Sequence, residues 1–124
     1  MAHLEDWLTE RKIGEVECLV PDMSGIARGK ILPASKFIKS VRENSLRLPE
    51  SIFIQTVTGE YAEDEEDEVV GPQDFDVVLQ PDEETLSLVP WYDEPTAQVI
   101  IDCFNRDGSP VEISSRFVLR RVLQ

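Results

Sequence analysis

The sequence predicts an α+β domain in which a mixed or mostly antiparallel sheet packs against one main helix. Several short segments alternate polar and apolar residues, a pattern typical of half-buried strands. One segment, residues 33–42, instead carries its apolar residues at helical spacing. With 124 residues, of which 41% are hydrophobic, the chain has enough material for one domain with a modest core.

The first half of the chain is expected to form a helix, a hairpin and a second helix. Leu4, Trp7 and Leu8 share one face of a helix predicted at 3–13, which Gly14 ends. A strand at 15–20 and another at 26–31 flank a turn rich in Pro, Asp, Ser and Gly, and therefore predict a hairpin. The helix at 33–42 follows, with Pro33 in its first turn and a connector at 43–49 after it.

The second half is expected to be mainly strand. Runs of β-branched and aromatic residues predict strands at 51–57, 76–79, 85–89 and 96–104. Ser114 or Ser115 then caps a last helix at 116–124. The chain stops within this helix, without a glycine or another C-terminal cap, and this predicts that a further segment follows it.

The charge is strongly acidic, with 25 acidic and 12 basic residues and a net charge of −13. Such a surface repels nucleic acid and anionic lipid, so we expect neither as a partner. Residues 63–68 are all acidic and predict a solvated loop, with a cation or polyamine site as the alternative.

The composition also indicates the compartment. Cys18 and Cys103 each lie in an apolar run and are expected to be buried, reduced thiols, as in a cytoplasmic protein. No apolar stretch approaches the roughly 20 residues needed to cross a bilayer.

Taken alone, the residues predict no self-sufficient active site, and hence no catalytic, cofactor-binding or metal-binding residues. His3 is the only histidine, so a serine or cysteine nucleophile has no evident base. Lys30 follows Gly29 without the spacing of a phosphate-binding loop and is expected to be a hairpin lysine. The paired carboxylates, Asp74 with Asp76 and Asp82 with Glu84, lie beside turns, where Asp commonly caps backbone groups.

Three stretches resemble the N-terminal domain of the glutamine synthetase family, and they occur in the family's order. Residues 22–30 resemble its Asp-x-x-Gly-x-x-Arg-Gly-Lys hairpin, residues 76–91 its strand-Pro-Asp-Thr segment, and residues 96–116 the strand leading into its linking helix. The resemblance implies a β-grasp-like curled sheet over residues 1–113. It makes residues 114–124 the start of the helix that links to a catalytic domain absent from this chain.

The same resemblance implies the function. The family uses ATP and divalent Mg or Mn to join ammonia or an amine to the side-chain carboxyl of glutamate. Its nucleotide and metal ligands belong to the catalytic domain, and its subunits form a homo-oligomeric ring. The loop after the third strand closes over the active site of a neighbouring subunit, so the resemblance implies a substrate-binding role for the residues that begin this loop here: Gln55, Thr56, Thr58 and Gly59. By itself, the chain is expected to be inactive.

Gln55 departs from the family pattern, because ordinary glutamine synthetases have an aspartate there that helps to hold ammonium. A neutral amide lacks that charge, so the resemblance points to the branch that uses larger amines such as polyamines. The alternative is that Gln55 and Thr58 only face solvent. Trp91 has two interpretations as well, a packing anchor or part of the intersubunit site.

Two other functions stay open at this point. The chain is alternatively a free-standing β-grasp module that acts through protein contacts, or an acidic mimic or cation buffer built on residues 63–68.

Overall fold

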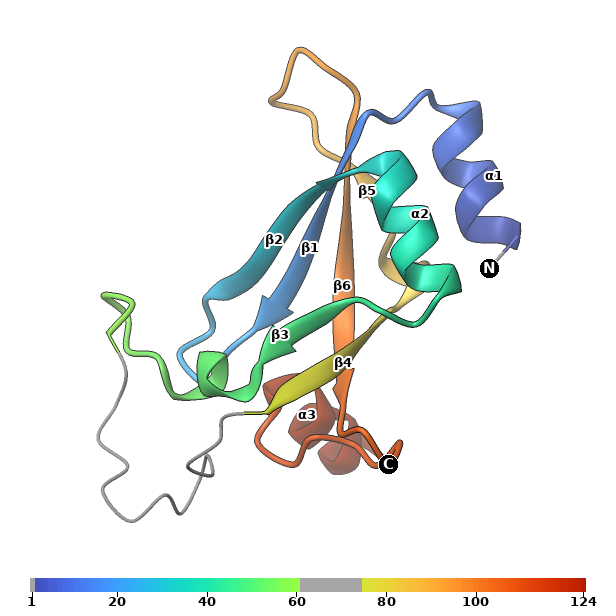
Figure 1. Ribbon diagram of the computed structural model, residues 1–124. Coiled ribbons are helices and arrows are strands. Elements are labelled where there is room, and N and C mark those ends of the chain that lie inside the picture. Colours follow the sequence, from blue (N-terminus) through green and yellow to red (C-terminus); the bar gives the residue numbers. More distant parts are fainter. Residues whose placement is uncertain (1, 61–74) are drawn as a thin grey trace.

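The computed structural model describes residues 2–60 and 75–124 (Figure 1). The elements follow one another along the chain as α1 (Ala2–Glu10), β1 (Glu15–Pro21), β2 (Ala27–Pro33), α2 (Ala34–Arg42), β3 (Arg47–Pro49), the 3₁₀ helix η1 (Glu50–Ile54), β4 (Asp76–Pro81), the 3₁₀ helix η2 (Glu83–Thr85), β5 (Ser87–Leu88), β6 (Thr96–Phe104) and α3 (Ser115–Leu123). The acidic run at 63–68 and Asp74 lie outside the described residues. Within the described residues, no helix is both long and apolar enough to span a membrane.

The strands form one mixed sheet in the order β2-β1-β6-β4-β3, with β5 paired to β6. The first and the last long strand, β1 and β6, run parallel, and Glu15 pairs with Thr96. The other pairs are antiparallel, including the β1–β2 hairpin that the sequence predicts. The predicted α+β class and mixed sheet are therefore confirmed.

The sheet curls until its two edge strands approach each other. Lys30 of β2 donates a hydrogen bond from Nζ to the Arg47 carbonyl of β3, at 2.8 Å. This side chain joins the edges where no strand pairing does, so the sheet is nearly a barrel. Lys30 is thus a hairpin lysine, as expected, and its side chain also links the two edge strands β2 and β3.

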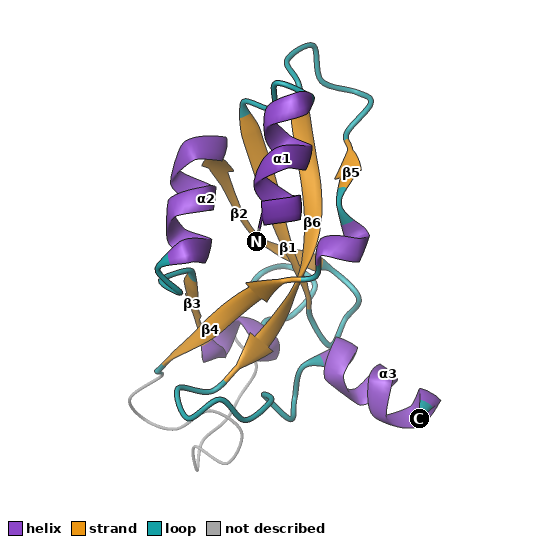
Figure 2. Ribbon diagram, turned by 90° about the vertical axis from the view of Figure 1, so that its right-hand side faces the viewer, coloured by secondary structure: helices purple, strands orange, loops and turns teal. Residues whose placement is uncertain are grey.

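Two helices fill the concave side of this curled sheet (Figure 2). Phe37 of α2 is fully buried, and Leu4 and Leu8 of α1 are 1% exposed. The strongest strand, β6, buries every second residue against them, which is the pattern of a strand with one solvated face. The core therefore lies between the sheet and both helices, and α1 contributes as directly as the main helix α2.

The predicted strand at 51–57 is wrong. Glu50–Ile54 forms the 3₁₀ helix η1, which turns the apolar side chains of Ile52 and Phe53 into the core. The strand lies earlier, at Arg47–Pro49, within the predicted connector. A run of apolar β-branched residues this short fits a buried turn as well as it fits a strand.

Smaller differences affect three other elements. The first helix ends at Glu10, before the positive φ of 52° at Lys12, and not at Gly14. Only Ser87 and Leu88 of the strand predicted at 85–89 pair with β6. Ser114 does precede the last helix, but its side chain makes no capping hydrogen bond.

Candidate functional site

The turn of the β1–β2 hairpin is organised by one buried carboxylate, Asp22. Its Oδ1 accepts backbone N–H hydrogen bonds from Ser24 at 2.9 Å and from Ile26 at 3.0 Å. Gly25, between them, has a φ of +76°, a conformation that glycine adopts without steric cost. The Asp and the first Gly of the hairpin motif therefore fix the turn.

Arg28 pairs with the other oxygen of Asp22. Its Nε donates to Oδ2 at 2.8 Å, and the two side chains are 19% and 1% exposed, respectively. Burial acts to raise the pKa of Asp22, but the hydrogen bonds from Arg28, Ile26 and Ser24 outweigh it and hold the pKa below its usual value. Asp22 is therefore a buried anion at neutral pH, and Arg28 is its counter-ion.

Gly29 allows the two strands of the hairpin to approach closely. A Cβ at this position would lie 1.7 Å from the carbonyl oxygen of Cys18, and φ is +144°. No L-residue fits without movement of the backbone. The second Gly of the motif is therefore required by packing.

The loop that follows η1, residues 55–60, is held against this hairpin through Arg28. The guanidinium donates from Nη2 to the Thr56 carbonyl at 2.7 Å. Within the loop, the Gly59 N–H donates to the same carbonyl at 2.9 Å, and the Thr56 N–H donates to Glu60. Arg28 thus connects the buried Asp22 to an exposed loop 28 positions further along the chain.

All four site residues predicted from the resemblance lie on this loop. Gln55 donates from Nε2 to the Gly59 carbonyl at 3.3 Å, so its amide is oriented with Oε1 on the opposite side. The hydroxyls of Thr56 and Thr58 lie 3.1 Å apart, and both side chains are exposed. At these four positions the loop offers only neutral hydrogen-bonding groups, which are suited to binding, and its one carboxylate is that of the exposed Glu60 at its end.

Comparison with known proteins supplies the identity that the geometry alone does not. No protein-family model matches the chain. Gamma-glutamylethanolamide synthetase GlnA4 of Streptomyces coelicolor is 34% identical over 90% of this chain, and glutamate–isopropylamine ligase of a Pseudomonas species is 28% identical over 98% of it. Human lengsin is 28% identical over 99%. The chain is an N-terminal domain of the glutamine synthetase family.

The solved structures agree with this family domain in fold. Ligand-free GmaS superimposes with a TM-score of 0.74 over 99% of the chain at 22% identity, and the ADP complex of GmaS with a TM-score of 0.70. The domain spans about a quarter of the length of the curated relatives it matches.

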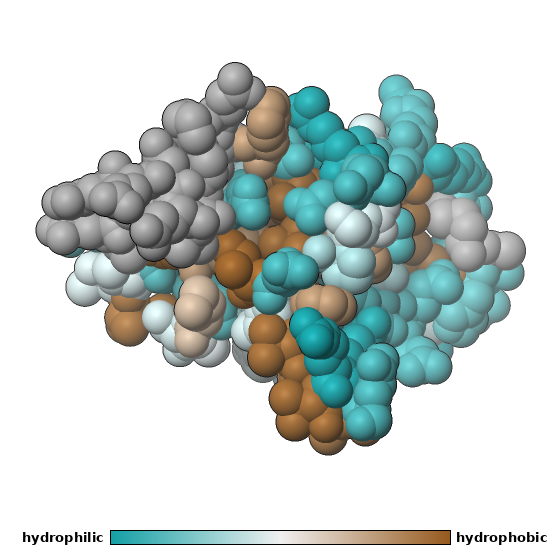
Figure 3. All heavy atoms as spheres, turned by 90° about the horizontal axis from the view of Figure 1, so that it is seen from below, coloured by the Kyte–Doolittle hydropathy of each residue, from teal (hydrophilic) through white to brown (hydrophobic). Residues whose placement is uncertain are grey.

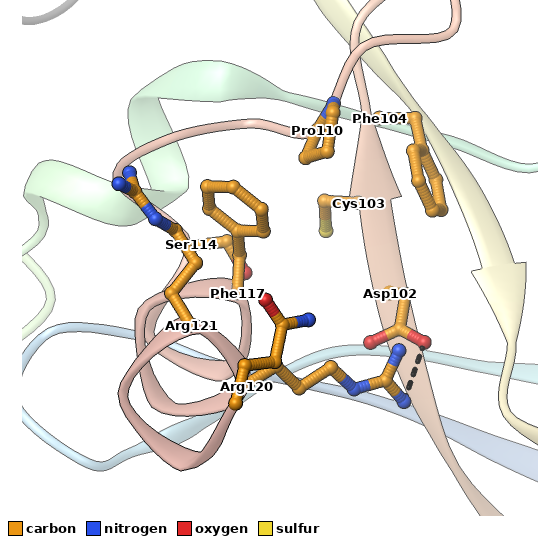
Figure 4. A pocket seen from close by; sticks show the side chains of 9 residues that line it. Asp102, Cys103, Phe104, Pro110, Ser114, Phe117, Arg120 and Arg121 are labelled. Atoms are coloured by element: carbon orange, nitrogen blue, oxygen red, sulfur yellow. Dashed lines mark ion pairs between the residues drawn. The ribbon is translucent and has the colours of Figure 1, made fainter.

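A hollow between β6 and α3 of this glutamine-synthetase-family domain is a second candidate site (Figure 4). Its wall includes Cys103, Phe117 and the ion pair between Arg120 and Asp102, whose atoms lie 3.2 Å apart. Burial raises the pKa of the Cys103 thiol to about 12, so the thiol stays protonated and is a poor nucleophile. Cys18 is free and buried in the same way, as predicted for both cysteines. We assign this hollow to packing of α3 and not to chemistry.

Trp91 is not the packing anchor that one interpretation predicts. Its side chain is 68% exposed, and its ring centroid lies 6.2 Å from that of Tyr92 in a tilted arrangement. The loop that carries both rings joins β5 to β6 and lies at the opposite end of the sheet from the hairpin turn (Figure 1). Trp91 therefore does not meet Gln55 within this domain.

Proposed function

We propose that this domain belongs to an ATP-dependent ligase that joins an amine larger than ammonia to the side-chain carboxyl of glutamate. In this proposal, loop 55–60 forms part of the amine site, at the interface with a neighbouring subunit. Two relatives bear the names of such reactions, with isopropylamine and ethanolamine as the amines. The observation that carries the proposal is the neutral amide of Gln55, oriented by its hydrogen bond to the Gly59 carbonyl, at a position that the resemblance assigns to the family's aspartate.

The amide selects among amines by its lack of charge. Ammonium is a small, strongly hydrated cation, and a carboxylate compensates for its desolvation better than an amide dipole does. A larger amine depends less on charge compensation by the side chain at position 55, because burial of its alkyl part also contributes favourable binding free energy. Val57, two positions after Gln55 on the same loop, is 71% exposed and offers apolar surface for that part.

We assign the ATP and Mg or Mn sites to a catalytic domain outside this chain, as the resemblance implies. There the metal ions would neutralise phosphate charge during transfer to glutamate, before the amine attacks. The partners in this proposal are the catalytic domains of the same and of a neighbouring subunit, in a homo-oligomeric ring. Both cysteines are free thiols, in keeping with a cytoplasmic ligase.

Helix α3 carries a surface suited to the catalytic domain. Its outward face exposes Val118, Leu119, Val122 and Leu123, each at least 49% accessible. Seen from below, this apolar strip lies along one side of the projecting helix (Figure 3). Contiguous exposed apolar surface of this kind marks a contact site, and we propose that the catalytic domain of the same subunit covers it.

The test is an amine panel with the full-length protein. With glutamate, ATP and Mg²⁺, we expect isopropylamine, ethanolamine or putrescine to give a kcat/KM at least about tenfold above that of ammonium. Gln55→Asp should move the ratio toward ammonium by roughly tenfold, because a carboxylate restores the missing charge. The isolated 124-residue chain should give no turnover.

Gln80→Asp is the matched control, because it makes the same chemical change at an exposed position on β4. It should leave the amine ratio unchanged. An unchanged ratio in Gln55→Asp would remove loop 55–60 from the amine site. Absence of turnover with every amine would favour the alternative of a protein-interaction module.

A further inference from the structure

The amine site proposed above depends on how loop 55–60 is held. The loop turns at Gly59, where φ is +87°, and its own hydrogen bonds set its shape. Those internal bonds do not fix the loop relative to the sheet. Arg28 fixes the loop relative to the sheet by donating a hydrogen bond to the Thr56 carbonyl.

The connection from the core to the loop is continuous. The turn amides of Ser24 and Ile26 fix Asp22, Asp22 fixes Arg28, and Arg28 fixes the carbonyl next to Gln55. Arg28 does this with two different nitrogens of one planar group, Nε toward Asp22 and Nη2 toward Thr56. A lysine ammonium at the end of a flexible chain does not reproduce both contacts in a fixed geometry.

We propose that Arg28 is a positioning residue for amine binding, which sets the place of Gln55 by holding the Thr56 carbonyl against the hairpin. The inference rests on the proposed function, and it extends the amine site to a residue of β2. Asp22 has the complementary part of holding Arg28 in place.

The pairing also solves an electrostatic problem. A guanidinium close to the loop would repel a protonated amine on approach. Asp22 lies 2.8 Å from the Arg28 Nε and balances this charge from the buried side. The Arg28 guanidinium can therefore hold the Thr56 carbonyl of the loop without adding a net positive charge at the amine site.

The experiment compares Arg28→Lys and Arg28→Met with wild type in the full-length protein. We expect the KM for the amine to rise about tenfold or more, while the KM values for glutamate and ATP change by less than about twofold. Arg47→Met is the matched control, because Arg47 also donates to backbone carbonyls, those of Asn44 and Leu46, on an edge strand away from the loop. It should leave the KM for the amine unchanged.

A second readout does not depend on catalysis. Hydrogen exchange at the Gly59 amide, which is bonded to the Thr56 carbonyl, should accelerate at least about tenfold in Arg28→Met, while the amides of β1 keep their protection. If Arg28→Met leaves Asp22 unpaired and unfolds the protein, the double variant Asp22→Asn/Arg28→Met removes both charges and is measured in its place.

The outcomes separate the two proposals. Faster exchange at Gly59 with a selective rise in the amine KM supports both. Unchanged exchange, or an unchanged amine KM in an active enzyme, overturns the role of Arg28 and leaves the ligase assignment standing. Faster exchange in a protein without any ligase activity supports only the anchoring of the loop by Arg28, and it overturns the proposed function and with it the role in amine binding.

Discussion

The β1–β2 hairpin and the helix α3 both attach an outlying segment through Asp–Arg pairs, but they do so in different ways. At the hairpin, one buried Asp22 meets one Arg28, and backbone amides supply the remaining hydrogen bonds. At α3, Arg116 and Arg120 each contact both Asp82 and Asp102, in a cluster with side chains between 17% and 51% exposed.

The two places differ in how many ion-pair partners each charged side chain has: Asp22 has one arginine, whereas Asp82 and Asp102 each have two. Removal of one partner from a buried pair leaves an uncompensated charge in a poorly solvated place, which is strongly destabilising. In the α3 cluster, each aspartate keeps a second arginine when one is removed, and water reaches the half-exposed Arg120, so the loss is compensated. The stability of the protein should therefore respond strongly to single substitutions at the hairpin pair and weakly to single substitutions at the α3 cluster.

The largest effect is expected from Gly29→Ala, which breaks the hairpin itself. The added Cβ meets the Cys18 carbonyl, so the two strands must separate, and unfolding should become easier by on the order of 4 kcal/mol. The control is Gly25→Ala, where a Cβ has no atom within 4 Å and only the positive φ matters. That variant should cost about 1 kcal/mol in urea unfolding. Equal effects in the two variants would show that the close approach at Gly29 is unimportant.

The next effect concerns Asp22→Asn, which should lower the free energy of unfolding by about 3 kcal/mol at pH 7. Because the pKa of Asp22 is lowered by folding, its contribution is complete above its unfolded pKa of about 3.9 and disappears as pH falls through the lower folded value. The difference between wild type and variant should therefore shrink below pH of about 4.

Asp107 provides the control for this pH dependence. The hydroxyl and the N–H of Ser109 lower its pKa too, but its side chain is exposed. Asp107→Asn should change stability far less at every pH. A gap between wild type and Asp22→Asn that stays constant down to pH 2 would mean that Asp22 does not act through its charge.

The smallest effect is expected at the α3 cluster. Arg120→Gln should cost about 0.5 kcal/mol and Arg116→Gln about 1 kcal/mol, because either arginine still bridges both aspartates when the other is gone. The double variant should lose more than the sum of the two, as expected for residues that share partners. Strict additivity in urea unfolding would contradict the shared cluster.

Much of the fold follows from local patterns in the sequence. The hairpin was predictable because alternating strands flank a turn at Gly25, and the helix at Ala34–Arg42 because Phe37 and its neighbours share one face. The strand Arg47–Pro49 was not predictable, since three residues ending in proline carry too little periodicity. Its pairing with β4 depends on residues far away in the chain.

In the candidate site, too, some features could be predicted from the sequence and others could not. The position of Gln55 follows from the resemblance of the chain to its family, and no local pattern marks it. The contact of Arg28 with Thr56 joins two segments that are remote in sequence, and a backbone carbonyl as acceptor leaves no signature in residue type. The sequence left Trp91 between a packing anchor and a part of the intersubunit site, because a large aromatic residue after a proline fits both, and only the structure shows that its side chain is 68% exposed.

The parallel pairing of β1 with β6 has a consequence for the synthesis of this protein. Glu15 must wait for Thr96 to leave the ribosome before its strand gains its second neighbour. Until then, only the β1–β2 hairpin and the two N-terminal helices have partners close in sequence. Strand β1 still lacks β6, the central strand of the sheet, as its neighbour. Closing so long a loop costs entropy before any contact compensates for it, so this domain should fold late and all at once, after translation has passed β6.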